Sequence, residues 1–122
     1  MQHRKLFSSF KYAFSGLIYA FSYNQNIRIH FFIAILVILA SIIFNVNAFE
    51  MGILGVMILL VISTEMINTA IEEMVNLIAN DHRKEAKIAK DVAAGMVLLT
   101  TFGSVVVGVL IFLPHLLRLL YK

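Results

Sequence analysis

Cysteine is absent from this chain of 122 residues, so disulfides, thiol catalysis and cysteine-ligated metals are excluded. Charged residues are also scarce: they make up 14% of the sequence, against about a quarter in an ordinary soluble domain. Apolar residues account for 61%, and the mean hydropathy is +0.90. A chain this short cannot bury so much apolar surface in a core of its own, because small domains bury a smaller fraction of their surface. We therefore expect residues 1–122 to form a single all-α membrane domain.

The sequence also lacks the motifs of soluble nucleotide-binding proteins. It contains no glycine-rich phosphate loop followed by lysine and none of the protein-kinase signatures. The net charge is +3, but no basic stretch is interleaved with aromatic residues, so nucleic acid is not expected as a partner. In a membrane protein, positive charge favours an anionic leaflet or an anionic substrate instead.

An amphipathic helix is predicted over residues 5–23. Its apolar side chains recur at helical spacing: Leu6, Phe7, Phe10, Phe14, Leu17, Ile18 and Phe21. Basic and hydroxyl side chains such as Lys11 and Ser15 lie on the other side, which is typical of a helix in the membrane interface. A packed helix of a soluble bundle is the weaker alternative, because the rest of the chain is so apolar. Cleavage as a signal peptide is not expected, since no small-residue cleavage site stands out.

Three further helices are predicted, over residues 27–44, 49–79 and 87–120, and each contains a stretch able to cross a bilayer. Polar, asparagine-containing turns are expected ahead of the first of them, at residues 23–26, and between the first two, at residues 45–47. The helix over 49–79 would be about 45 Å long at about 1.5 Å per residue, longer than the hydrocarbon core. Its second half should therefore emerge among the headgroups, and that half holds the polar residues. In the last helix, the small residues Gly95, Gly103 and Gly108 are expected where helices approach closely.

Lysine and arginine are distributed unevenly around these helices. Eight of the ten precede the first span or lie between the second and third spans, and Arg118 and Lys122 follow the third. The positive-inside rule then places the N-terminus and the 80–91 loop in the cytoplasm and the C-terminus outside.

A polar stripe interrupts the second span. Glu65, Asn68, Glu72 and Asn76 are spaced three, four and four residues apart, so they share one side of a helix. Carboxylates in a membrane are costly and usually face a bundle interior or a wet cavity, where they mark a functional site. The alternative is structural, with polar side chains holding helices together.

A second polar cluster, which includes Lys87, Lys90 and Asp91, opens the third span. A hairpin between the second and third spans would bring it near the lower end of the stripe. Together they would supply carboxylates for a divalent cation, cations for phosphates and a deeper Glu for a lipid hydroxyl, which are the requirements of phosphoryl transfer. The alternative is an ordinary basic flank of a membrane helix with an Asp at the helix start.

The paired motifs resemble the signature of the bacterial diacylglycerol kinase family, the small integral-membrane lipid kinases. They read Glu65-x-x-Asn68-x-Ala70-Ile71-Glu72 and Ala89-Lys90-Asp91-x-Ala93-Ala94-Gly95. Segments 87–95 and 26–30 resemble the undecaprenol kinase branch. The resemblance implies a homotrimer in the bacterial inner membrane, with an interfacial helix and three transmembrane helices per subunit and active sites shared between subunits. It further implies ATP- and Mg²⁺-dependent phosphorylation of a membrane lipid alcohol, either undecaprenol or diacylglycerol.

The resemblance also assigns roles to individual positions. Glu65 matches the proposed catalytic base and Glu72 a magnesium ligand, while Asn68 and Arg28 match residues that support the site or bind substrate. The positions that match nucleotide-contacting residues are Lys5, Tyr12, Asn24, Glu72, Asp81, His82, Arg83, Lys90 and Asp91.

Asn24 departs from the family pattern, which has a magnesium-binding Glu at this place. An amide offers an oxygen but no charge, so metal binding should be weaker. Asn76 likewise stands where family members often carry Asp. A non-catalytic relative that binds lipid or nucleotide is therefore the main alternative. A transporter or ion-conducting oligomer is a third, since membrane carboxylates can relay protons, but the absence of inverted repeats argues against it.

Overall fold

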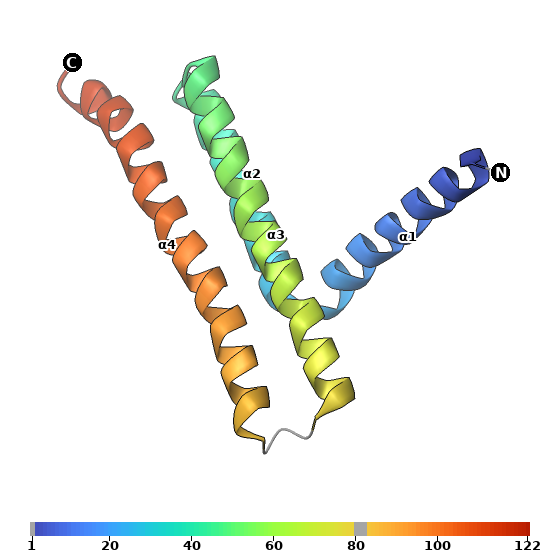
Figure 1. The fold of residues 1–122 in the computed structure, drawn as a ribbon. Coiled ribbons are helices and arrows are strands. Elements are labelled where there is room, and N and C mark those ends of the chain that lie inside the picture. Colours follow the sequence, from blue (N-terminus) through green and yellow to red (C-terminus); the bar gives the residue numbers. More distant parts are fainter. Residues whose placement is uncertain (1, 80–82) are drawn as a thin grey trace.

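A computed structural model describes residues 2–79 and 83–122 as four helices (Figure 1). In chain order these are α1 (Gln2–Tyr23), α2 (Gln25–Ile43), α3 (Ala48–Ile78) and α4 (Lys84–Leu120). Judged by length and composition, α2, α3 and α4 could each cross a membrane. The prediction of an all-helical chain with one N-terminal helix and three candidate spans is confirmed.

Helix α3 is central to the arrangement, because α2 packs on it and α4 runs along it in the opposite direction (Figure 1). Helix α1 departs obliquely from the others, and its N-terminal end lies well away from them (Figure 1). Its C-terminal end is attached: Ala20 is buried, and the Phe21 ring packs edge-on against Phe31 of α2 with centroids 5.6 Å apart.

Asparagine side chains cap the starts of α2 and α3. Asn24 alone separates α1 from α2, so the predicted turn over residues 23–26 shrinks to one residue. The predicted turn over residues 45–47 is present, with Asn45 in the left-handed region at φ 58° that asparagine tolerates better than most residues. Asn47 and Glu50 then form a reciprocal capping box, in which Asn47 Oδ1 accepts from the Glu50 N–H at 2.8 Å.

The closest packing of α4 involves alanine and not glycine. Ala86 and Ala93 are buried, whereas a methyl group added at Gly95 or Gly108 would meet no described atom within 4 Å. At Gly103 it would meet only the end of the Met57 side chain, at 3.9 Å. The prediction that these glycines mark close approaches is therefore wrong within the described chain, because only Gly103 faces another helix, and there it meets the flexible end of a side chain.

Large apolar side chains mostly point outward from the spans. Ile43, Leu59 and Leu98 are 77%, 67% and 71% exposed. A surface like this is unfavourable in water but suits lipid or a neighbouring subunit, whereas the small buried core holds α2, α3 and α4 together. One polar contact joins α3 and α4 inside this apolar region, between the hydroxyls of Thr64 and Thr100 at 3.0 Å.

Candidate active site

A polar cavity of about 260 Å³ lies where the α1–α2 junction meets the second half of α3. Its walls come from the end of α1, the start of α2 and one side of α3: Tyr19, Tyr23, Asn24, Gln25, Asn26, Glu65, Asn68, Thr69, Glu72 and Glu73. Three members of the predicted stripe thus share one cavity. The fourth, Asn76, contacts α4 instead.

Glu65 is the deepest acid of this cavity, with only 2% of its surface exposed. Its Oε1 accepts hydrogen bonds from Asn24 Nδ2 at 3.1 Å and from Asn26 Nδ2 at 3.5 Å. A buried carboxylate is costly unless it is hydrogen-bonded, and these two amides supply that compensation without a positive charge. Such a carboxylate remains available to accept a proton from a substrate hydroxyl.

Asn68 lies one turn further along α3 and is 7% exposed. Its Nδ2 donates to Glu72 Oε1 at 3.4 Å, while its Oδ1 is buried without a hydrogen-bond partner among the described residues. Buried oxygens in native proteins are almost always paired, so an unpaired one beside a carboxylate indicates a place for a ligand.

These oxygens fit a magnesium ion that also binds phosphate. Within residues 2–79 and 83–122, no group of three or more acidic or histidine side chains could hold a metal by itself. Mg²⁺ commonly takes only one or two carboxylates and completes its shell with phosphate oxygens and water. Glu72 and Asn68 Oδ1 satisfy that requirement. Glu73, on the same cavity, adds a second carboxylate, whose Oε1 accepts a hydrogen bond from the Tyr19 hydroxyl at 3.2 Å.

The second predicted cluster reaches the lower end of the stripe but not the cavity. Lys90 Nζ donates to Asn76 Oδ1 at 2.7 Å, which joins α4 to α3. Asp91 Oδ2 pairs with Lys87 Nζ at 2.6 Å on the exposed side of α4. The hairpin therefore brings the clusters together at Asn76, about one turn beyond Glu72.

The other predicted site residues are spread out. Lys5 and Tyr12 are exposed on the part of α1 that extends away from α3 (Figure 1). Arg28 Nη1 donates to the Ser22 carbonyl at 3.3 Å, and Arg83 occupies the cap position of α4. Asp81 and His82 lie outside the described residues. One chain thus assembles Asn24, Glu65, Asn68 and Glu72, and the predicted nucleotide contacts on α1 and α4 stay predictions.

Six cavity residues had no predicted role: Tyr19, Tyr23, Gln25, Asn26, Thr69 and Glu73. Thr69 and Glu73 follow Glu65 at intervals of four, so a second stripe lies beside the first, and its spacing was available in the sequence. Tyr19 and Asn26 could not be found in that way, because their place depends on how α1 and α2 meet α3.

An apolar groove of about 310 Å³ is formed by the same three helices as the polar cavity. It lies between α1, α2 and α3, and its lining is apolar throughout: Leu17, Ile18, Ala20, Phe21, Ile27, Phe31, Ile62 and Met66. The two spaces have no lining residue in common, but Met66 follows Glu65 and Ala20 follows Tyr19, so neighbouring positions of α3 and α1 line them. An amphiphilic molecule could place its chain in one and its polar end in the other.

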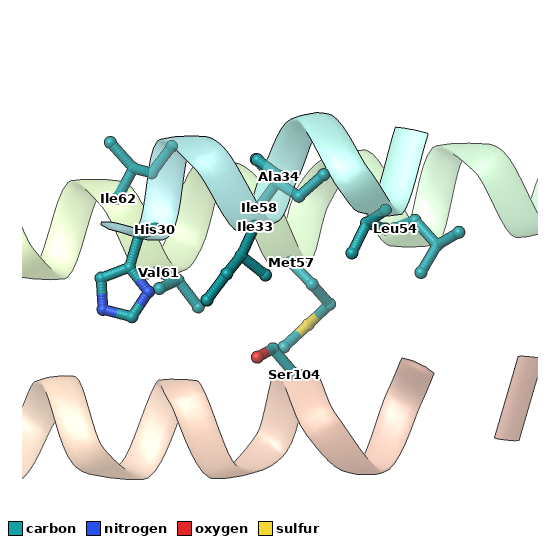
Figure 2. Close-up of a pocket in the computed structure, with 10 residues that line it drawn as sticks. His30, Ile33, Ala34, Leu54, Met57, Ile58, Val61, Ile62 and Ser104 are labelled. Carbon is teal, nitrogen blue, oxygen red and sulfur yellow. The ribbon is translucent and has the colours of Figure 1, made fainter. Parts of the chain in front are cut away.

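A third space, of about 70 Å³, lies between α2, α3 and α4 (Figure 2). Apart from His30 and Ser104 its lining is apolar, and Met57 reaches from α3 toward Ser104 on α4 (Figure 2). It contains no carboxylate and is too small for a lipid headgroup, so it is not the candidate site.

Comparison with known proteins identifies the family of the chain. A family model described as prokaryotic diacylglycerol kinase matches residues 11–112. The chain belongs to the prokaryotic diacylglycerol kinase family. This confirms the resemblance drawn from the paired motifs and makes the chain a homologue of membrane lipid kinases.

Two relatives from this family illustrate its range. A diacylglycerol kinase of Synechocystis sp. is 41% identical over 116 residues, which cover 94% of this chain and 66% of that protein. This chain therefore spans just under two thirds of that relative's length. An undecaprenol kinase of Bacillus subtilis is 36% identical over 112 residues, which cover 92% of this chain and 91% of that protein. The higher identity to the diacylglycerol kinase means that the predicted place in the undecaprenol branch is not confirmed.

Proposed function

We propose that this protein transfers the γ-phosphoryl group of ATP to the hydroxyl of a membrane lipid alcohol. The observation that supports this most is Glu65, a buried carboxylate that lines the polar cavity next to Met66, which lines the apolar groove. A lipid chain in the groove would bring a terminal hydroxyl to Glu65 while phosphates occupy the polar side. The acceptor is undecaprenol or diacylglycerol, the two lipids named for the relatives.

Glu65 acts as the general base in this proposal. It takes the proton of the lipid hydroxyl as that oxygen bonds to the γ-phosphorus, and the bond from that phosphorus to the β–γ bridging oxygen breaks. ADP leaves with the bridging oxygen, and the proton on Glu65 returns to water. Phosphoryl transfer depends mainly on positioning and charge stabilisation, so one well-placed base is sufficient.

Glu72 and Asn68 Oδ1 would hold the magnesium ion of the nucleotide, and Glu73 would add charge. When bound, Mg²⁺ neutralises the charge on the transferred phosphoryl group. The cations that meet the remaining phosphate charge would be Lys5, Arg83 and Lys90. We propose that the protein forms a homotrimer in which neighbouring subunits share each site, so that Tyr12 and Asp91 also contact the nucleotide. The site would lie on the cytoplasmic side of a bacterial inner membrane.

The second candidate function is binding of lipid or nucleotide without turnover. Asn24 favours it, because this chain has an amide where the family pattern has a metal-binding carboxylate. The two functions differ in the fate of ATP, so a transfer assay separates them.

The test is an assay with the purified protein in detergent–lipid micelles, with Mg²⁺, radiolabelled ATP and either undecaprenol or diacylglycerol. We expect labelled phospholipid with at least one acceptor. Glu65→Gln should lower turnover by about 10²- to 10⁴-fold, the usual contribution of a general base. Glu50→Gln is the matched control, because Glu50 lies at the opposite end of the same helix and should leave turnover unchanged. A folded parent that labels neither lipid would contradict the proposal.

A further inference from the structure

Asn24 uses every hydrogen-bonding group that it has. Its backbone N–H donates to the Ala20 carbonyl at 3.0 Å, which ends α1, and its own carbonyl accepts from the Arg28 N–H at 3.4 Å, which begins α2. Its side-chain Oδ1 accepts from the Asn26 N–H at 2.9 Å as the cap of α2. The oxygen that could have met a metal is therefore turned toward the helix start.

The side-chain nitrogen of Asn24 faces α3 and makes two hydrogen bonds there. Nδ2 donates to Glu65 Oε1 at 3.1 Å and to Thr69 Oγ1 at 2.6 Å. Thr69 Oγ1 in turn donates to the Glu65 carbonyl oxygen at 3.0 Å. Asn24 thus holds Glu65 both directly, at the carboxylate, and through Thr69, at the backbone.

The hydrogen bonds to Glu65, Thr69 and the Asn26 N–H fix the orientation of the Asn24 side-chain amide. Exchanging Oδ1 and Nδ2 would set an oxygen against the Glu65 carboxylate and an N–H group against the Asn26 N–H. Two hydrogen bonds would be replaced by two repulsive contacts, so only the orientation with the nitrogen toward Glu65 satisfies both sides.

We propose that Asn24 is a positioning residue for Glu65 and not a metal ligand, an inference that rests on Glu65 being the base of the proposed lipid kinase. A carboxylate at position 24 has no N–H to donate and would place a second negative charge against Glu65. The amide therefore performs a task that the acidic residue of the family pattern cannot. The charge for the metal then comes from α3, through Glu72 and Glu73.

Asn24→Asp separates the two roles, because Asp has the same shape and keeps the capping oxygen. A ligand role predicts tighter metal binding and higher activity from the added charge. The positioning role predicts the opposite: a loss of kcat on the order of 10²-fold, as expected for a displaced catalytic group, with little change in the KM for ATP. Asn47→Asp is the matched control, since Asn47 also caps a helix by its side chain but lies at the far end of α3. It should leave kcat unchanged.

Two further measurements do not depend on kinase activity. In the double variant Asn24→Asp with Glu65→Gln, the Gln amide can donate to the Asp carboxylate, so the hydrogen bond returns with reversed polarity. We expect Asn24→Asp to lower the thermal midpoint in detergent and the double variant to recover most of that loss while staying inactive. Binding of Mn²⁺, followed by electron paramagnetic resonance, should not become tighter in Asn24→Asp than in the parent.

The outcomes distinguish this inference from the proposed function. Unchanged or higher kcat in Asn24→Asp, tighter Mn²⁺ binding, or a double variant no more stable than Asn24→Asp would each overturn the positioning role. A folded parent that phosphorylates no lipid would instead remove the proposed function. The stability and Mn²⁺ measurements would then still decide whether Asn24 is a donor to Glu65 or a ligand.

Discussion

The Tyr19 hydroxyl donates a hydrogen bond to Glu73 Oε1 across 3.2 Å, and this contact joins the end of α1 to α3 at the polar cavity. The Tyr19 ring also stacks on Tyr23, with centroids 4.6 Å apart. The hydrogen bond to Glu73, together with its negative charge, raises the pKa of Tyr19, because the carboxylate favours the protonated phenol.

Glu73→Gln should lower the pKa of Tyr19 toward its ordinary value of about 10. Because the pKa of Tyr19 is raised in the folded state, the contact contributes its full stabilisation at pH values below the ordinary pKa of tyrosine. That stabilisation is lost as the pH rises through the raised pKa. The measurement is an ultraviolet titration of tyrosinate, in which the difference between the parent and Tyr19→Phe isolates this residue from the other three tyrosines. An identical Tyr19 titration in the parent and in Glu73→Gln would contradict the contact.

Glu72→Gln should weaken Mn²⁺ binding by at least about 10-fold. Removing a residue that only hydrogen-bonds to a metal ligand already costs about that much, and Glu72 is proposed as a ligand itself. Glu73→Gln should weaken it less, since that carboxylate already accepts the Tyr19 hydrogen bond. Binding can be followed by electron paramagnetic resonance with a non-hydrolysable ATP analogue present. Glu50→Gln serves as the distant control, and equal affinity in all three variants would exclude the cavity as the metal site.

Thr64 and Thr100 should couple energetically across the α3–α4 contact. Their hydroxyls lie 3.0 Å apart, and each also lies within hydrogen-bonding distance of a carbonyl of its own helix, that of Val61 for Thr64 and that of Val97 for Thr100. Each hydroxyl has one proton, so one of them donates across the contact while the other donates within its own helix. We expect a double-mutant cycle with Thr64→Val and Thr100→Val to give a coupling of about 0.6 kcal/mol, typical of polar contacts between membrane helices. Reversible unfolding in mixed detergent micelles measures it, and additive single effects would contradict the contact.

The absence of cysteine makes the orientation easy to test, because a single introduced thiol is the only one in the chain. Val46→Cys, in the turn between α2 and α3, should react with a membrane-impermeant maleimide applied to intact cells. Glu85→Cys, near the start of α4, should react only in inverted vesicles or after permeabilisation. The reverse pattern would show that the N-terminus and the 80–91 loop lie outside.

Much of the fold was predictable because helices in a membrane follow simple rules. Apolar length located α2, α3 and α4, and the asparagines at 45 and 47 located the turn between two of them. The spacing of Glu65, Asn68 and Glu72 predicted a shared side of α3, and all three line one cavity. Periodicity and turn chemistry act locally, so sequence alone was sufficient for these features.

The remaining features depend on how separate helices meet. Asn24 matches a metal-binding position in the family pattern, yet its side-chain oxygen is used to cap α2 and its nitrogen faces Glu65. The orientation of the Asn24 side chain depends on where α3 lies relative to the α1–α2 junction, and a local sequence pattern does not predict that position. The glycines of α4 were misassigned for the same reason, since small residues show that an approach is allowed but not which side of the helix makes it.

Helix α1 is joined to the rest of the molecule through one non-helical residue, Asn24, and that same residue holds Glu65. If Glu65 is the base, as we propose, a change in the tilt of α1 would reach that carboxylate through Asn24, with no flexible linker to absorb it. An amphipathic helix responds to lipid packing and curvature. For the proposed kinase we therefore expect turnover to depend on the lipid packing and curvature of the bilayer as well as on the substrate dissolved in it.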